Sequence, residues 1–280
     1  MSQAHRVPVA LTIAGSDSGG GAGIQADLKT FAALGVHGTS AITCLTAQNP
    51  GCVLDLQAAR PHMVRQQIEA VFAELPPAAV KTGLLHSAEV IRVVAAFFRA
   101  PRRPPLIVDP VMVATSGAPL LRPGAIRILE EELLPLATLI TPNLHEAQIL
   151  TGRRLTSASD LRRAARELHR RFGCAALVKG GHLKGLKEAV DLFFDGKTEL
   201  LLSAPFVAGV KTHGTGCTYS AAITAWLARG RELTAAVEQA KDYVTQAIAQ
   251  SQRAGRHSVL HHLWMLRQGG LKAVNGRAIF

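Results

Sequence analysis

The chain has 280 residues, 48% of them hydrophobic, and no polar linker, which predicts a single globular domain spanning residues 1–280. It contains no run of about 18 uncharged apolar residues, which excludes a membrane-spanning helix, and the apolar run near its N-terminus lacks a cleavage-like site, so we expect a cytoplasmic location. The formal net charge is +11, but the basic residues are spread over helical segments without interleaved aromatics, which disfavours nucleic-acid binding and leaves a field that attracts anionic substrates.

Short apolar runs alternate with longer segments of helical period, a pattern typical of an α/β fold with a mostly parallel sheet. In chain order, strands are expected at 9–14, 39–45, 79–82, 106–108, 139–141 and 175–179. The helices between them are expected at about 24–34, 61–74, 87–99, 123–134, 144–151 and 158–172. Residues 189–194 and 199–203 then predict a small antiparallel hairpin. A helix opening after Gly214, a long helix at about 232–251 and a helical piece near 260–266 complete the prediction.

Each predicted parallel strand ends in a polar or glycine-containing cluster. Ligands of open α/β sheets bind outside the carboxyl ends of the strands, so we expect these clusters to line one ligand site. They are Gly15-Ser16-Asp17, Gln48-Asn49, Lys81-Thr82-Gly83, Asp109-Pro110-Val111, Thr141-Pro142-Asn143 and Lys179-Gly180-Gly181.

The stretch T-H-G-T-G-C-T, residues 212–218, opens a predicted helix. Gly214 and Gly216 let the backbone approach a ligand, and the N–H groups of a first helical turn form an anion site. Such amides suit a phosphoryl group during transfer. A helix N-terminus lowers the pKa of a thiol, so Cys217 can act as a general base or a nucleophile. A glycine-rich helix start that binds no ligand is the alternative.

A second glycine-rich stretch, G-S-D-S-G-G-G-A-G-I-Q-A-D, occupies residues 15–27. It contains one formal match to the dinucleotide-binding pattern G-x-G-x-x-A, so a dinucleotide-dependent oxidoreductase is a candidate function. However, the second strand ends in A-Q-N rather than in the acid that holds a ribose, and no G-x-x-x-x-G-K-[ST] loop occurs. Asp27 can hydrogen-bond a polar heterocycle or hydroxyl, or it can cap or solvate the start of its helix.

Two further strand ends carry groups suited to bind phosphate and metal. Asn143 and Glu146 lie at i and i+3 of a starting helix, where they either bind a hydrated Mg²⁺ or form a capping box. Lys179 ends a strand beside a glycine turn and can meet a phosphate, or it is a surface lysine with a buried stem.

Taken together, these stretches resemble the bacterial hydroxymethylpyrimidine/phosphomethylpyrimidine kinases of thiamine biosynthesis, in the ribokinase-like superfamily. The resemblance extends from about Val9 to Leu263. Two departures are S-D-S-G-G-G for the usual S-D-P-S-G-G, and Leu84 where methionine is common. The resemblance rests on A-L-T-I-A-G-S-D-S-G-G-G-A-G-I-Q-A-D-L-K-T-F, A-Q-N, K-T-G-L-L, D-P-V-M-V-A-T-S-G, T-P-N-L-H-E-A, V-K-G-G-H and T-H-G-T-G-C-T.

The resemblance implies a ribokinase-like fold, a three-layer αβα sandwich with a mostly parallel central sheet and a small antiparallel hairpin. It implies a kinase that uses ATP and Mg²⁺ to phosphorylate the hydroxymethyl group of 4-amino-5-hydroxymethyl-2-methylpyrimidine, and then the resulting monophosphate. Homodimers are usual in the family, so we expect a homodimer.

The resemblance also implies roles for individual residues. Gly214 and Gly216 form the anion hole, Cys217 activates the hydroxymethyl oxygen, and Lys179 neutralises phosphate charge. The other implied positions are Gly15, Asp27, Gln48 and Val111 for the pyrimidine, Thr212 and Asn143 with Lys179 for ATP, and Asp109 and Glu146 for magnesium, through water.

A pyridoxal kinase of the same cysteine-containing branch is the alternative function, because pyridoxal also has a hydroxymethyl group. The triplet A-Q-N favours the pyrimidine, since such pyridoxal kinases typically lack this glutamine. The dinucleotide-dependent oxidoreductase is a more distant alternative.

Overall fold

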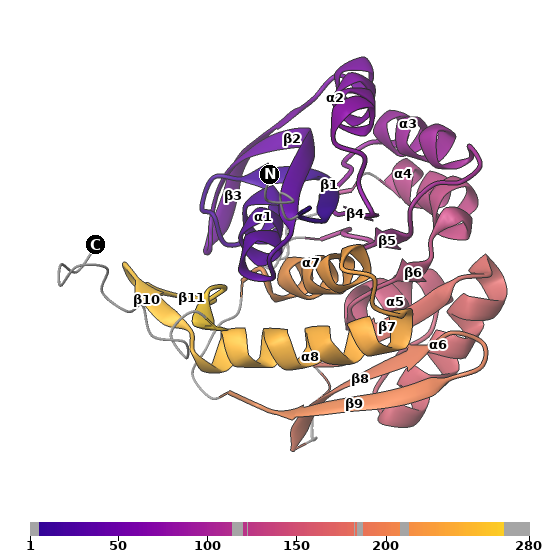
Figure 1. Cartoon of the computed structure of the whole chain (residues 1–280). Coiled ribbons are helices and arrows are strands. Elements are labelled where there is room, and N and C mark those ends of the chain that lie inside the picture. The colour runs from indigo at the N-terminus through magenta and orange to yellow at the C-terminus, as the bar shows by residue number, and fades with distance from the viewer. Residues whose placement is uncertain are drawn as a thin grey trace.

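The computed structural model describes residues 6–113, 120–121, 123–181, 183, 187–207 and 213–265, and within them nine strands form one sheet (Figure 1). The parallel strands are β1 (Val9–Asp17), β2 (His37–Asn49), β4 (Ala79–Thr82), β5 (Leu106–Val108), β6 (Leu139–Ile140) and β7 (Ala175–Lys179). The antiparallel strands are β3 (Cys52–Ala58), β8 (Glu188–Phe194) and β9 (Glu199–Pro205). The order across the sheet is β3-β2-β1-β4-β5-β6-β7-β8-β9, so the antiparallel strands form both edges.

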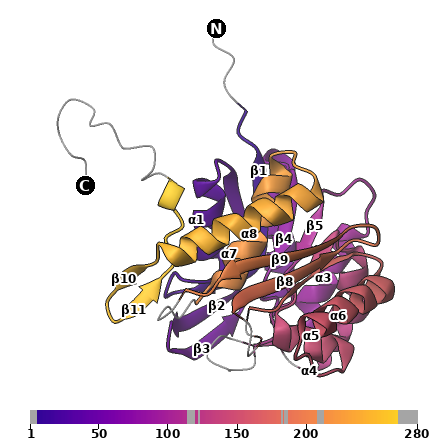
Figure 2. The ribbon, with the colours of Figure 1, turned by 90° about the horizontal axis from the view of Figure 1, so that it is seen from below.

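Helices cover both faces of the sheet. One face packs against α1 (Gly23–Ala33), α7 (Thr215–Ala228) and α8 (Leu233–Ala249), which lie together in Figure 2. The other face packs against α2 (Pro61–Glu74), α3 (Ala88–Phe98), α4 (Pro123–Ile128), α5 (Leu144–Thr151) and α6 (Ala158–Phe172). No helix in the described part of the chain has the length and apolarity needed to cross a bilayer.

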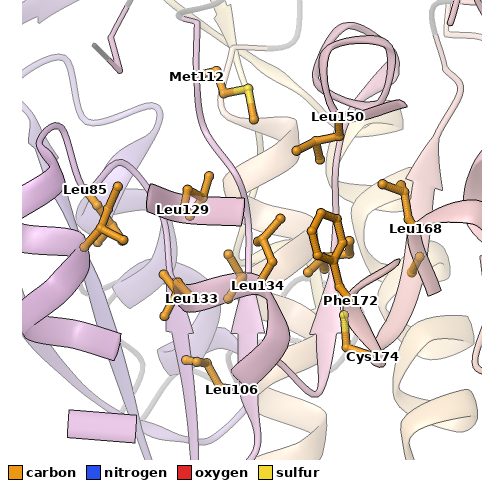
Figure 3. Packing of buried hydrophobic residues seen from close by; sticks show 14 of the residues in the cluster. Leu85, Leu106, Met112, Leu129, Leu133, Leu134, Leu150, Leu168, Phe172 and Cys174 are labelled. Carbon is orange, nitrogen blue, oxygen red and sulfur yellow. The ribbon is translucent and has the colours of Figure 1, made fainter. Parts of the chain in front are cut away.

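The core is divided by the sheet because successive residues of a strand point to opposite faces. In β1, Leu11 and Ile13 pack toward α2 and α3, whereas Ala10 packs toward α1 and α7. Figure 3 shows part of the first of these cores, where Leu134 and Phe172 lie among other buried apolar side chains. The sheet therefore holds its strand ends rigidly between two packed layers.

The structure confirms the predicted α/β class and most of the predicted elements. The strands β4, β5 and β7 and the helices α2, α5 and α6 have the predicted bounds. The helix expected at 123–134 ends earlier, at Ile128, and continues as a π-helical turn (Leu129–Leu133) and a 3₁₀ turn (Leu134–Leu136). Pro135 lies in the first turn of the 3₁₀ segment, where its missing N–H is tolerated, whereas it would break a continuing α-helix.

Three elements were not predicted from the sequence. They are the edge strand β3 and the hairpin strands β10 (Gln252–Ala254) and β11 (His257–Val259). Of the helical piece expected near 260–266, Trp264 and Met265 are helical, and residue 266 lies outside the described residues.

The carboxyl ends of the parallel strands lie along one edge of the sheet. Asn143, which follows β6, forms a parallel bridge with Lys179 at the end of β7. Helix α7 begins beside this edge, at Thr215. The fold therefore brings segments from both ends of the chain to the strand ends.

Candidate functional site

A cavity of about 730 Å³ opens at the carboxyl ends of the parallel strands. This volume is within the range of small-molecule sites. The predicted site residues that line it are Gly15, Asp27, Gln48, Asp109, Val111, Asn143, Glu146, Lys179, Gly214, Gly216 and Cys217. Thr212, predicted to border ATP, lies outside the described residues.

Gly214 forms the N-cap of α7 with a left-handed backbone, φ = 86°. A Cβ atom at this position would overlap the carbonyl oxygen of Gly21, so the turn requires glycine. Gly214 has no side chain and therefore makes no side-chain capping hydrogen bond to the helix. A Cβ atom on Gly216 would lie 3.2 Å from the Nζ atom of Lys179, so the first turn of α7 closely approaches that cation. The helix start thus combines amide groups with a lysine, as an anion site requires.

Cys217 lies in this first turn and is half-buried. Burial raises the pKa of the Cys217 thiol to about 12, although the charge of Lys81 and a hydrogen bond from the Gly23 N–H lower it. The sequence-based expectation of a lowered pKa is therefore wrong. The helix N-terminus is present as predicted, but desolvation of the sulfur has the larger effect.

Asp27 of α1 forms a buried ion pair with Lys81 of β4. The Nζ atom of Lys81 lies 2.7 Å from one carboxylate oxygen, and the Thr12 hydroxyl donates to the other at 2.6 Å. Both charged side chains are 0% exposed. Burial raises the pKa of Asp27, while the charge of Lys81 opposes that rise. Both oxygens of Asp27, the predicted pyrimidine ligand, thus already have protein partners.

A second ion pair joins Asp109, after β5, to Lys179. The Nζ atom of Lys179 lies 3.0 Å from Asp109 Oδ1, which also accepts from Thr141, and Ser220 of α7 donates to Oδ2. Burial raises the pKa of Asp109, but the charges of Lys179 and Lys81 outweigh it, so the pKa lies below its ordinary value. Asp109 is therefore a carboxylate at neutral pH.

Asn143 and Glu146 form a capping box at the start of α5. The Asn143 side chain accepts from the Glu146 N–H at 3.0 Å, and Glu146 accepts from the Asn143 N–H at 2.8 Å. Burial raises the pKa of Glu146 to about 8, and the negative charge of Asp109 adds to the effect. The capping interpretation is thus confirmed. It does not exclude a metal role, since both residues also line the cavity.

Magnesium fits this group of residues by chemistry. Asp109 and Glu146 are oxygen donors, and their mutual repulsion is the kind that a divalent cation relieves. Within the described residues, no group of three His, Cys, Asp or Glu side chains is arranged to hold a metal. A hydrated ion held by two carboxylates and substrate phosphates needs no such group.

The first glycine-rich loop is organised by Asp17, which sequence analysis placed at the edge without a role. Its carboxylate accepts from the N–H groups of Gly19, Gly21 and Ala22, at 2.8–3.2 Å. The Nε2 atom of His213 lies 2.9 Å from the same carboxylate and 3.4 Å from the Gln48 amide nitrogen. His213 therefore links this loop to the end of β2 and to the start of α7.

An apolar wall lies beside Gln48. Cys44, Leu84 and Leu120 form a small buried cluster, and Val111 packs against it. A Cβ atom on Gly15 would lie 2.7 Å from the Cys44 sulfur, so only glycine leaves room there. A polar amide beside an apolar wall suits a flat heterocycle with hydrogen-bonding edges.

The cavity has another polar group that sequence analysis missed. Lys241 of α8 donates to Asp191 of β8 at 2.8 Å, and the Gly180 N–H donates to the other Asp191 oxygen. Tyr219 lines the same cavity, and its hydroxyl has no hydrogen-bond partner among the described residues. The only signal in the sequence is a lone aspartate within the apolar strand V-D-L-F-F.

The fold and this cavity define the chain as a ribokinase-like α/β enzyme. The chain belongs to the phosphomethylpyrimidine kinase family, since the family profile with that description matches residues 17–262. It is 51% identical over 250 residues to a hydroxymethylpyrimidine/phosphomethylpyrimidine kinase of Synechococcus elongatus, an alignment that covers 89% of this chain and 95% of that one.

Two solved structures are also similar. A phosphomethylpyrimidine kinase from Clostridium difficile is 42% identical, with a TM-score of 0.76, and covers 87% of this chain and 100% of its own. The ADP complex of Bacillus subtilis pyridoxal kinase is 35% identical, with a TM-score of 0.85, and covers 94% of this chain and 100% of its own. The predicted family and fold are confirmed, while the roles of single residues stay predictions.

Proposed function

We propose that the chain is an ATP-dependent kinase of thiamine biosynthesis. It phosphorylates the hydroxymethyl group of 4-amino-5-hydroxymethyl-2-methylpyrimidine and then converts the monophosphate to the diphosphate. One observation carries the proposal: in a chain 51% identical to a kinase of this name over 250 residues, Gln48, Lys179 and Cys217 line one cavity although they are far apart in sequence.

The pyrimidine is placed between Gln48 and the wall formed by Leu84 and Val111, because that end offers an amide beside apolar carbon. The nucleotide base is placed at the other end, where Val244 and Ile248 of α8 line the cavity. The first turn of α7 lies at the same cavity, where its amides can bind the phosphoryl group in transit.

Each charged residue then has one task in phosphoryl transfer. Lys179, beside Gly216, offsets the charge of the phosphoryl oxygens. Cys217, as the thiolate, accepts the proton of the hydroxymethyl group while the oxygen of that group attacks the γ-phosphorus of ATP. Asp109 and Glu146 would hold Mg²⁺ through water, and the ion would supply positive charge to the phosphates.

Pyridoxal kinase is the second candidate, because the TM-score of 0.85 to a pyridoxal kinase exceeds that to the phosphomethylpyrimidine kinase. The purified chain should be incubated with MgATP and either the hydroxymethylpyrimidine, its monophosphate or pyridoxal. We expect ADP release and mono- and diphosphate products, by mass spectrometry, from the pyrimidines. Turnover of pyridoxal alone would reverse the order of the two candidates.

Replacing Cys217 with serine tests the base. We expect kcat to fall about 100-fold or more, because serine is a far weaker acid and the step is proton transfer. ATP should still bind, as measured by calorimetry. Cys52→Ser is the matched control, because that half-buried cysteine does not line the cavity. Near-normal kcat in Cys217→Ser would remove the cysteine from this role.

Replacing Gln48 with alanine tests the pyrimidine end. Loss of one hydrogen bond to the ring, about 1.5 kcal/mol, should raise KM for the pyrimidine about tenfold and leave KM for ATP unchanged. The control Gln66→Ala changes an exposed glutamine on α2. An equal rise in both KM values would place Gln48 away from the ring.

The homodimer expected from the resemblance stays a prediction, which light scattering of the purified chain can check.

A further inference from the structure

Three lysine–aspartate ion pairs among the described residues line the cavity: Lys81 with Asp27, Lys179 with Asp109, and Lys241 with Asp191. The first pair is 0% exposed, and the second faces the phosphoryl group under the proposed function. The side chains of Lys241 and Asp191 are 9% and 6% exposed, so the cavity reaches them. Phosphoryl transfer as proposed assigns no task to this third pair.

The sheet places the third pair beyond the phosphate site. Asp191 of β8 lies opposite Lys179 of β7 in the antiparallel register, so their side chains are on the same face of the sheet. The N–H of Gly180, the next residue after Lys179, donates to Asp191 at 3.0 Å. Gln48 is on β2, and β1, β4, β5 and β6 separate that strand from β7. The pair therefore lies on the side of Lys179 that is away from the pyrimidine end.

One face of helix α8 lines the same end of the cavity. Lys241, Val244, Thr245 and Ile248 all line it, and their spacing of i, i+3, i+4 and i+7 puts them on one side of the helix. Val244 and Ile248 are the residues beside which the proposed function places the nucleotide base. Lys241, one to two turns nearer the helix start, joins this face to Asp191. The pair thus lies between the site of the transferred phosphoryl group and the site of the base.

The pair can make further hydrogen bonds of both kinds. An ammonium has three N–H donors, and among the described residues Lys241 uses two of them, to Asp191 at 2.8 Å and to the Ala189 carbonyl oxygen at 3.2 Å. Each oxygen of Asp191 accepts one hydrogen bond, which leaves a lone pair on each. A hydroxyl group, which accepts and donates, suits this combination. A phosphate only accepts, and the carboxylate would repel it.

Tyr219 of α7 is a second indication that a ligand binds here. It lines the cavity, and its buried hydroxyl has no hydrogen-bond partner among the described residues. Burial, and then the negative charge of Asp191, raise the pKa of this hydroxyl, so the tyrosine lies near the pair. Buried polar groups are normally hydrogen-bonded, so we expect a bound ligand to supply the partner.

We propose that Lys241 and Asp191 determine specificity for the ribose of the nucleotide, by hydrogen bonds to its 2′ or 3′ hydroxyl. This rests on the proposed function, in which the base lies beside Val244 and Ile248. The Lys241 ammonium donates to the hydroxyl oxygen, and the hydroxyl donates to an oxygen of Asp191. A nucleotide that lacks this hydroxyl leaves both members of the pair without that partner and binds more weakly.

The first test uses the wild-type chain without any pyrimidine. Binding of MgADP, and of its 2′-deoxy and 3′-deoxy forms, is measured by calorimetry. We expect ADP to bind about tenfold more tightly than at least one deoxynucleotide, the loss typical of one hydrogen bond to a charged group. Equal affinity for all three nucleotides would overturn the proposal, and so would a crystal of the ADP complex with both hydroxyls beyond hydrogen-bond distance of Lys241 Nζ.

The second test replaces both members of the pair together. Lys241→Met alone would leave Asp191 buried without its cation, and because burial already raises the pKa of that carboxyl, it would take up a proton. The double variant Lys241→Met/Asp191→Leu leaves no unpaired charge, and apolar residues of similar size often replace a buried ion pair without loss of stability. We expect it to bind ADP and the deoxynucleotides with equal affinity, within about twofold. A preference that stays at the wild-type value would overturn the proposal.

The matched control is Lys81→Met/Asp27→Leu, which replaces another buried pair of the cavity. Its preference for ADP over the deoxynucleotides should stay at the wild-type value, because general loosening weakens binding of all three alike. Loss of the preference in this control as well would overturn the assignment to Lys241 and Asp191. Circular dichroism and thermal denaturation report whether each variant folds.

Activity assays separate this inference from the proposed function. Equal kcat/KM for ATP and both deoxy-ATP forms in an active pyrimidine kinase would retain the kinase function and reject the ribose contact. A ribose preference in a chain that binds ADP but does not phosphorylate the pyrimidine would retain the contact and reject the proposed function. Absence of ADP binding in the wild type would reject both.

Discussion

The two glycine-rich loops, residues 15–23 and 213–217, look alike in sequence but differ in what their backbone amides bind. In the first loop, the carboxylate of Asp17 accepts hydrogen bonds from Gly19, Gly21 and Ala22. In the second, the N-cap residue of the helix is Gly214, which has no side chain to accept hydrogen bonds from the amides. The first loop therefore contains its own anion, and the second offers its helix start to the cavity.

This difference explains why the dinucleotide-like pattern of the first loop does not indicate a phosphate-binding site. A ring of backbone N–H groups makes an anion site, but here a side chain of the same loop fills it. His213 connects Asp17 to the second loop at 2.9 Å. The first loop thus holds the second in position through this contact. Substitutions in the two loops should therefore have unequal effects on stability and on kcat/KM.

The largest effect is expected for Gly214→Ala. Its φ of 86° is strained for alanine, and the new methyl group would overlap the Gly21 carbonyl oxygen. We expect a loss of about 3–5 kcal/mol in the free energy of unfolding, measured in urea, from strain and overpacking together. The kcat/KM for the pyrimidine should fall about 100-fold as the amides move. A fully stable and active variant would contradict the required geometry.

An intermediate effect is expected for Asp17→Ala. Removal of the carboxylate leaves three N–H groups, whose hydrogen bonds to it are partly buried, without this partner, which should cost about 2 kcal/mol of unfolding free energy. Because the loop only braces the second one, kcat/KM should fall less than in Gly214→Ala. An equal or larger loss of kcat/KM would show that the first loop contacts the phosphates itself.

The pH dependence of this variant provides a control. Burial raises the pKa of Asp17, but hydrogen bonds from His213, Ala22 and Gly19 outweigh it, so the folded pKa lies below the ordinary value. The stabilisation is therefore present above about pH 4 and is lost as the pH falls through the folded pKa. Urea unfolding at pH 7, 5, 4 and 3 should show the difference between wild type and Asp17→Ala shrinking only below about pH 4.

The smallest effect is expected for Gly20→Ala, which serves as the matched control for Gly214→Ala. Gly20 also has a left-handed backbone, with φ = 71°, but the nearest atom to a new Cβ is the flexible end of Lys29, at 3.4 Å. Strain alone should cost about 1 kcal/mol, with kcat/KM unchanged. A loss of activity equal to that of Gly214→Ala would remove the contrast between the loops.

Elements with a strong local signal were predicted well. The short strand β5 is a continuous apolar run, and β7 is apolar up to its last residue, Lys179, because both of their faces are covered. Helix α6 has a capping box at Ser157 and Asp160. The strand β3 was missed because it lies at an edge, where Leu54 is 76% exposed and no buried face sets an alternating pattern.

It could be predicted from the sequence which residues lie at the edge of the sheet, but not which of their side chains pair with one another. The rule that ligands bind at strand ends gave at least one cavity residue from each of the six predicted clusters. The pairing of Asp27 with Lys81, or of Asp17 with His213, links positions 54 and 196 residues apart, and no local pattern encodes it. The pKa of Cys217 was predicted in the wrong direction for the same reason, because burial depends on the whole fold.

The meeting of α1 with α7 and α8 has a consequence for how the chain is made. Phe31 of α1 is buried against the layer that contains Tyr219 and Val244, which the ribosome synthesises long after it. A nascent chain that ends after β9 contains all nine strands of the sheet but leaves the apolar side of α1 uncovered. The cavity, which Tyr219 and Val244 also line, is thus completed last, and until then the apolar side of α1 is exposed to solvent.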